Sequence, residues 1–131
     1  MTDGSYRIQM SQSRLHLWHG GRLVTPEPLS SVALFSAYRV RIFAALLGLT
    51  PRRLHQCFVH DLGLTPKEWM RGERMVRARY LLREGRMVKE VAEKLGFTSP
   101  RDFAREFQWF YSVSPTDFQR VEWKRARRQP E

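Results

Sequence analysis

The sequence has little of what several classes of protein require. It contains one cysteine, Cys57, so it can form neither an internal disulfide nor a multi-cysteine zinc site. Its longest apolar run, residues 42–49, is far shorter than the roughly 18 residues of a membrane span. The N-terminus lacks the basic-then-apolar pattern of a signal peptide. We therefore expect a reduced, cytoplasmic protein that does not cross a membrane.

Signatures of catalysis and of cofactor binding are also missing. The sequence has no phosphate-binding loop, nucleophile elbow or zinc motif. The four histidines, His16, His19, His55 and His60, have no acidic or cysteine partner at a metal-ligand spacing. Cys57 is explained as a small, partly buried hydrophobic residue in a helix. We expect no enzyme activity, no cofactor and no metal ion.

Acidic residues are scarce relative to basic ones. Thirteen Asp and Glu stand against 23 Lys and Arg, which gives a net charge of +10 and a pI near 10.8. Only four of these bases are lysines, and the arginine guanidinium suits both phosphate and guanine. Both halves of the chain share the excess, which favours a polyanionic partner, either nucleic acid or an acidic membrane surface. Charge alone also leaves open a merely soluble basic protein.

An internal repeat organises the rest of the chain. Four residues recur 48 positions later, and after one extra residue, Thr98, seven more recur 49 positions later. The pairs are Ala44 with Ala92, Leu47 with Leu95, Gly48 with Gly96, Leu49 with Phe97, Thr50 with Ser99, Leu54 with Phe103, Phe58 with Phe107, Leu64 with Val113, Thr65 with Ser114, Pro66 with Pro115 and Trp69 with Phe118. The repeat predicts two copies of one structural unit.

Each copy has the pattern of a helix, a sharp turn and a second helix. Residues 88–95 are apolar on one helical face, and Gly96 can adopt the left-handed conformation that ends a helix. Residues 38–47 and Gly48 repeat this pattern in the first copy. A Ser or Thr followed by Pro is typical of a helix start. Such starts occur at Thr50-Pro51, Thr65-Pro66, Ser99-Pro100 and Ser114-Pro115. The expected core faces are Leu54 and Phe58 in the first copy and Phe103, Phe107 and Phe110 in the second. Trp18, Trp69, Trp109 and Trp123 are expected to pack rather than to stack on bases.

The second copy carries the most specific motif. It reads Val91-Ala92-x-x-Leu95-Gly96-Phe97-x-Ser99, then Phe103-x-Arg105-x-Phe107, then Val113-Ser114-Pro115-x-x-Phe118-x-Arg120. With these residues, and with Arg74, Ala78 and Leu81-Leu82, residues 38–120 resemble the DNA-binding region of the AraC/XylS family of bacterial transcription regulators. The resemblance implies an all-α fold, in which one long central helix joins two helix-turn-helix subdomains and each subdomain inserts its second helix into a DNA major groove. Residues 66–83 would make roughly 27 Å of central helix, a length suited to two reading heads about one DNA turn, ~34 Å, apart.

The resemblance also implies which residues contact DNA. The family's base-reading positions fall on Arg52, His55 and Gln56 in the first copy and on Pro100, Arg101, Asp102, Ala104 and Arg105 in the second. Phosphate contacts are expected from Thr50, Arg53, Lys89 and Ser99. Arginine can bond guanine O6 and N7, and glutamine can bond adenine N6 and N7. Asp102 would repel phosphate, so we expect it mainly to cap its helix, or else to orient Arg101 or Arg105.

Some residues depart from the family pattern. Ser112 stands where the family usually has glycine, whereas Gly63 is retained in the first copy. Pro100 and Ala104 take the place of polar base readers, which leaves Arg101 and Arg105 to carry the second head. Readout there is expected to be narrow or to depend more on DNA shape.

Residues 1–37 precede the first copy, where most family members carry a sensor domain of a hundred or more residues. We expect two short strands, at residues 15–19 and 22–25, around Gly20-Gly21, and a short helix over residues 29–36. A lone hairpin is unstable, so it must dock on the helices or on a partner. We expect no small-molecule effector, and either a single-domain family member or the DNA-binding fragment of a longer protein.

Together these features predict a sequence-specific double-stranded DNA-binding transcription regulator. We expect it to bind promoter DNA as a monomer, in the cytoplasm and associated with the nucleoid. RNA polymerase is a candidate second partner. The family more often activates than represses, but no residue here decides between the two. One alternative is an adaptor or anti-regulator that binds RNA polymerase or another regulator through its N-terminal extension, and another is a sequence-indifferent architectural DNA binder. The expected divisions are residues 1–37, 38–65, 66–84, 85–120 and a basic tail, 121–131.

Overall fold

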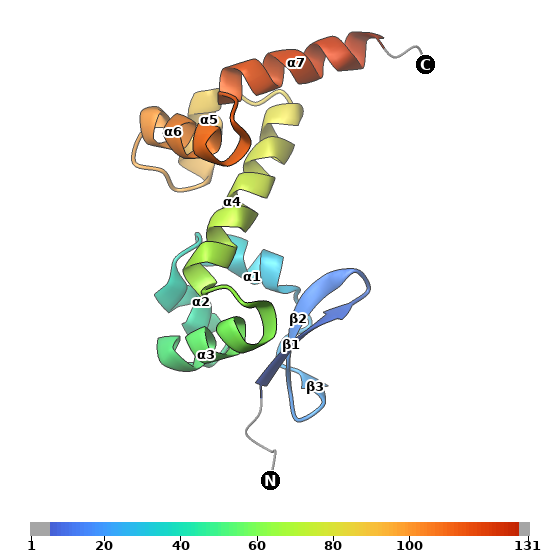
Figure 1. The fold of residues 1–131 in the computed structure, drawn as a ribbon, viewed down its shortest axis with the longest axis vertical. Coiled ribbons are helices and arrows are strands. Elements are labelled where there is room, and N and C mark those ends of the chain that lie inside the picture. Colours follow the sequence, from blue (N-terminus) through green and yellow to red (C-terminus); the bar gives the residue numbers. More distant parts are fainter. Residues whose placement is uncertain (1–5, 129–131) are drawn as a thin grey trace. The chain divides into compact units, whose positions relative to one another are not determined.

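The computed structural model describes residues 6–128, which form a small sheet followed by seven helices (Figure 1). The strands are β1 (Tyr6–Ser11), β2 (Arg14–His19) and β3 (Arg22–Leu23). The helices are α1 (Leu29–Phe35), α2 (Val40–Leu46), α3 (Pro51–Leu62), α4 (Pro66–Arg83), α5 (Val88–Lys94), α6 (Pro100–Tyr111) and α7 (Pro115–Arg128). The chain divides into two compact units, the first ending at Glu73 and the second beginning at Arg74. The predicted mostly helical fold with a long central helix is confirmed.

The sheet belongs to the core of the first unit. Its strands are antiparallel in the order β1-β2-β3, and the register places Ile8 opposite Leu17. Both side chains are buried with Leu29 of α1 and with Phe58 of α3. The backbone N–H of Ile8 also donates a hydrogen bond of 2.8 Å to the Asp61 carboxylate at the end of α3. The sheet therefore docks on the helices of its own unit, where Figure 1 shows it beside α1 and α3.

Two local conformations explain where the first unit differs from the sequence-based expectation. The predicted strands around Gly20-Gly21 are present as β2 and β3, but β1 was not predicted. The β1–β2 turn places Gln12 and Ser13 at φ 52° and 67°, and this pair lacks the Gly or Asn that normally reveals such a turn. The helix predicted from residue 38 starts at Val40, because Tyr38 is left-handed at φ 60°.

The first helix-turn-helix consists of α2, a turn at Gly48 and α3. Gly48 has φ 72°, a conformation that glycine adopts without strain. The side chain of Thr50 then accepts a hydrogen bond of 3.1 Å from the Arg53 backbone N–H and caps α3. Behind the motif, the ring of Phe58 lies 5.9 Å from that of Phe43 and 5.4 Å from that of Trp69. This aromatic contact holds α2, α3 and the start of α4 together.

The second helix-turn-helix, α5 to α6, repeats this construction. Gly96 makes the turn at φ 78°, and the Ser99 hydroxyl caps α6 by accepting from the Asp102 backbone N–H at 3.1 Å. Arg74 supports the turn, because its Nε donates to the Leu95 carbonyl at 2.9 Å and its guanidinium lies 3.6 Å from the centre of the Phe97 ring. The core of α6 consists of Phe103 and Phe107, both fully buried, while Phe110 is half-buried.

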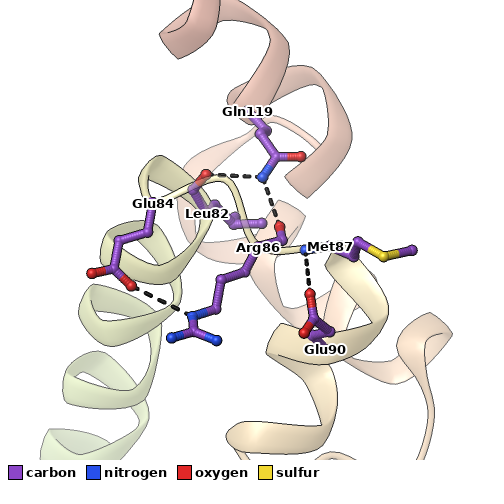
Figure 2. A network of polar contacts seen from close by, with 6 residues as sticks. All are labelled: Leu82, Glu84, Arg86, Met87, Glu90 and Gln119. Carbon is purple, nitrogen blue, oxygen red and sulfur yellow. Dashed lines mark hydrogen bonds and ion pairs between the residues drawn. The ribbon is translucent and has the colours of Figure 1, made fainter.

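Helix α7 fixes the connection between α4 and α5 within the second unit. Figure 2 shows the Gln119 amide between two backbone carbonyls, to which its nitrogen donates: Leu82 at 2.8 Å and Arg86 at 2.7 Å. Glu122 adds an ion pair of 2.9 Å with Arg83. The chain predicted to be a basic tail from residue 121 is therefore helical to Arg128. The expectation that Trp123 packs is wrong, because 47% of this residue is exposed.

Candidate nucleic-acid interface

Helix α3 separates its predicted DNA-contacting residues from its core residues. Leu54 and Phe58 are fully buried, and Arg52, His55 and Gln56 are exposed. Arg52 and Gln56 are four residues apart, so they lie one helical turn from each other on the outer face. Sequence periodicity was sufficient to find this face.

Helix α6 presents the equivalent outer face in the second unit. Arg101 and Arg105 are exposed, opposite the buried Phe103 and Phe107. The Asp102 carboxylate contacts Arg105 Nη2 at 3.0 Å, while only the backbone N–H of Asp102 takes part in the Ser99 cap. Of the two roles expected for the Asp102 side chain, capping α6 or orienting an arginine, the structure shows the second, with Arg105 as the arginine.

The other residues predicted to contact DNA lie at different places around the two recognition helices. Pro100 is exposed at the first turn of α6, and Ala104 is half-buried beside the outer face. Thr50 and Ser99 accept backbone hydrogen bonds as caps, and each hydroxyl still has a proton to donate. Lys89 is exposed on α5 rather than on the recognition helix itself. The structure thus groups these residues by unit, with Lys89 one helix earlier than the others.

Trp109 is a surface residue that sequence reasoning missed. Its expected packing is wrong, because 72% of the side chain is exposed on α6. Trp109 lies four residues after Arg105 and eight after Arg101, so it continues their face of the helix. This spacing in the sequence could have placed Trp109 on the exposed face of α6. By contrast, Trp69 packs in the first unit as expected, with 9% exposed.

The sheet reaches the first turn of α3 through an aromatic side chain. The Arg53 guanidinium lies over the Tyr6 ring, 5.5 Å from its centre. The Tyr6 ring stacks on His19 with centres 4.2 Å apart and planes 10° apart. Neither Tyr6 nor His19 was predicted to lie near the DNA-contacting residues, because β1 itself was not predicted.

The Asp61 carboxylate anchors the other contact between sheet and helix. Burial raises the pKa of Asp61, but the hydrogen bond from Ile8 and the neighbouring His60 and Arg7 lower it by more, so the net pKa lies below its ordinary value. His60 Nδ1 contacts the same carboxylate at 2.8 Å. The group is therefore ionised near neutral pH and holds β1 against the end of α3.

Residues 6–128 lack the features of a metal site and of a membrane span. This range holds no cluster of three or more His, Cys, Asp or Glu that could bind a metal ion. None of its helices has the length and hydropathy needed to span a membrane. Burial raises the pKa of the Cys57 thiol, which makes it a poor nucleophile.

Comparison with known sequences finds bacterial regulatory proteins among the relatives of this chain. A family model described as a helix-turn-helix domain matches residues 43–121, more than half of the chain. The Msm operon regulatory protein of Streptococcus mutans is 29% identical over 86 residues, covering 65% of this chain and 31% of its own length. The transcriptional activator RhaS of Salmonella arizonae is 33% identical over 75 residues, covering 56% of this chain and 27% of its own. The chain thus spans less than a third of these relatives.

Solved structures share the fold. An AraC-type DNA-binding regulator from Chromobacterium violaceum matches with a TM-score of 0.64 at 20% identity, covering 79% of this chain and 91% of its own. The DNA-binding domain of the global transcriptional factor AdpA, solved with a target DNA, matches with a TM-score of 0.62 at 28% identity, covering 78% and 96%. The repeated motif, the two capped recognition helices and the matched family model agree with one another. This chain belongs to the AraC-type helix-turn-helix family.

Proposed function

We propose that this chain is a sequence-specific double-stranded DNA-binding transcription regulator that acts by binding rather than by catalysis. The observation that carries the proposal is the repeated outer face. Arg52 with Gln56, and Arg101 with Arg105, are exposed at equivalent positions of two capped helices. The net charge of +10 supports a polyanionic partner.

Affinity and specificity come from different residues in this proposal. Phosphate contacts from Thr50, Arg53, Lys89 and Ser99 release counterions and supply much of the binding free energy. Base contacts in two successive major grooves select the sequence. The base readers are Arg52, His55, Gln56, Pro100, Arg101, Asp102, Ala104 and Arg105. A monomer with two such units needs no dimer partner to read a bipartite site.

The two recognition helices differ in how freely their side chains can turn toward the bases. Arg105 is already paired with Asp102, and a base contact must compete with that ion pair or keep it while Arg105 turns. Arg101 is exposed one helical turn earlier and is the principal base reader of the second unit. In the first unit, Gln56 would favour adenine and Arg52 guanine.

The adaptor alternative has less support. A partner held by the N-terminal extension would need its apolar face, yet Ile8 and Leu17 are buried against helices of the same unit. A transcription regulator works on the chromosome, so we propose a cytoplasmic, nucleoid-associated protein. RNA polymerase remains a candidate partner once the chain is on promoter DNA.

Selection from a random duplex pool at about 150 mM salt tests the proposal, with the bound DNA sequenced. A motif of two short blocks about one helical turn apart is the expected result. One block alone would mean that the second unit does not read bases. Binding without any enriched motif would favour an architectural DNA binder, and absence of binding would favour the adaptor.

A further inference from the structure

We propose that the end of the N-terminal sheet formed by Tyr6, His19 and Arg22 is a second DNA-binding element of the first unit, which holds backbone phosphates beside the bases contacted by α3. The inference rests on the proposed function and adds a phosphate-binding surface outside the helix-turn-helix repeat. It concerns the first unit alone.

Strand register places the three residues in one row. Tyr6 pairs with His19 across β1 and β2, and His19 pairs with Arg22 across β2 and β3. Directly paired residues share a face of the sheet, and neighbouring strands are about 4.8 Å apart. The row therefore extends across the sheet by roughly 10 Å. The stacked rings of Tyr6 and His19 keep its first two members in contact.

The row begins at a residue already expected to touch DNA. The Arg53 guanidinium lies over the Tyr6 ring, 5.5 Å from its centre. The Ile8–Asp61 hydrogen bond fixes β1 along α3 and so keeps Tyr6 at this place. Arg53, the stacked Tyr6 and His19 rings, and Arg22 thus form a row of side chains that starts at the first turn of the recognition helix and carries a guanidinium at each end.

The charge of the sheet also favours DNA. Residues 6–25 contain Arg7, Arg14 and Arg22 but no aspartate or glutamate, whereas an ordinary solvated surface mixes both signs. All three arginines are exposed. Strand alternation places Arg22 on the face of the row and Arg7 and Arg14 on the opposite face, so Arg22 is the charge that continues the recognition-helix surface toward the phosphates that flank its base pairs.

The test compares two arginines of the same sheet. Arg22→Gln removes a charge from the row, and Arg14→Gln removes the same charge from the opposite end, where Arg14 pairs with Ser11. On the duplex selected by the full chain, Arg22→Gln should weaken binding roughly threefold to tenfold at about 150 mM salt and lower the slope of log K against log salt by about 1. Arg14→Gln should change binding by less than about twofold, the bulk effect of one charge.

A second variant and a second readout keep the result unambiguous. Tyr6→Leu keeps an apolar side chain but removes the ring that carries Arg53, and it should weaken binding at least as much as Arg22→Gln. Thermal unfolding shows whether each variant remains folded. Equal binding by Arg22→Gln and Arg14→Gln would overturn the inference and leave the proposed function intact, as would a changed base preference in Arg22→Gln. Absence of duplex binding by the unmodified chain would overturn both.

Discussion

The two helix-turn-helix units share a sequence pattern but differ beside the recognition helix. Arg53 in α3 and Asp102 in α6 occupy equivalent positions in the first turn. Arg53 lies over Tyr6 of the sheet, whereas Asp102 pairs with Arg105 of its own helix. In the first unit, the sheet therefore extends the surface beside the recognition helix. In the second unit, the equivalent residue pairs with a neighbour on its own helix. The comparison teaches that a repeat can conserve a fold while assigning different electrostatic tasks to the same position.

Elements outside the repeat also stabilise the two units differently. The first unit is covered by a sheet, which buries Ile8 and Leu17 and bonds to Asp61. The second is completed by α7, whose Gln119 satisfies two carbonyls at the end of α4 and in the following loop. The first attachment combines apolar burial with a charged hydrogen bond, and the second combines the polar contacts of Gln119 with a ring contact between Phe118 and the buried Phe107, 5.6 Å between centres.

The largest effect is expected from the equivalent core phenylalanines. Phe58→Ala and Phe107→Ala each remove a fully buried ring and should lower the free energy of unfolding by about 3–5 kcal/mol. Urea unfolding followed by circular dichroism measures both losses. A loss below about 1 kcal/mol in one variant would show that its unit repacks around the missing ring.

Equivalent base readers should have the next largest effect. Arg52→Ala and Arg101→Ala should each weaken binding to the selected duplex by about 1–3 kcal/mol and relax one position of the motif. Fluorescence anisotropy on the selected duplex and its single-base variants measures this. If Arg101→Ala weakened every sequence equally, Arg101 would contact only phosphate.

The anchor of the sheet should have an intermediate effect. Asp61→Ala leaves the Ile8 N–H without its acceptor and should cost about 1–3 kcal/mol, while Asp61→Asn keeps an acceptor oxygen and should cost less. Because folding lowers the pKa of Asp61, its stabilising contribution is present above pH ~4 and is lost as the pH falls through the lowered value. Unfolding free energies between about pH 3 and pH 7 test this. An unchanged pH dependence in Asp61→Asn would contradict it.

The smallest effect is expected at the ends of the recognition helices. Gly63 ends α3 at φ 71°, but Ser112 adopts φ 58° at the end of α6. Ser112→Gly should therefore raise stability by about 0.5–1 kcal/mol, and Gly63→Ser should lower it by a similar amount. Thermal unfolding measures both shifts. Destabilisation by Ser112→Gly would mean that the serine side chain contributes more than its backbone strain costs.

Local chemistry decided which parts of the fold could be predicted. The helix starts at Thr50 and Ser99 and the turns at Gly48 and Gly96 depend on a few neighbouring residues, and the sequence displays them directly. Strand β1 depends on pairing with β2 and on docking to Asp61, and its turn uses residues without a distinctive preference. A sequence pattern could not reveal it.

The recognition faces were predictable for the same reason, but their neighbours were not. Helical period alone places Arg52, Gln56, Arg101 and Arg105 opposite the core. The Tyr6–Arg53 contact joins residues that are 47 positions apart, and nothing local specifies it. Trp109 was misjudged because a large aromatic residue is more often buried than exposed on a helix.

The burial of Cys57 has a practical consequence. As the sole thiol of the chain, it lies on the inner side of α3, 8% exposed and with a raised pKa. An alkylating reagent can reach it only when α3 separates from its surroundings, so the labelling rate reports the free energy of that local opening. The chain thus carries a natural reporter for local opening of its first recognition helix, which can be followed with DNA present or absent and without introducing another cysteine.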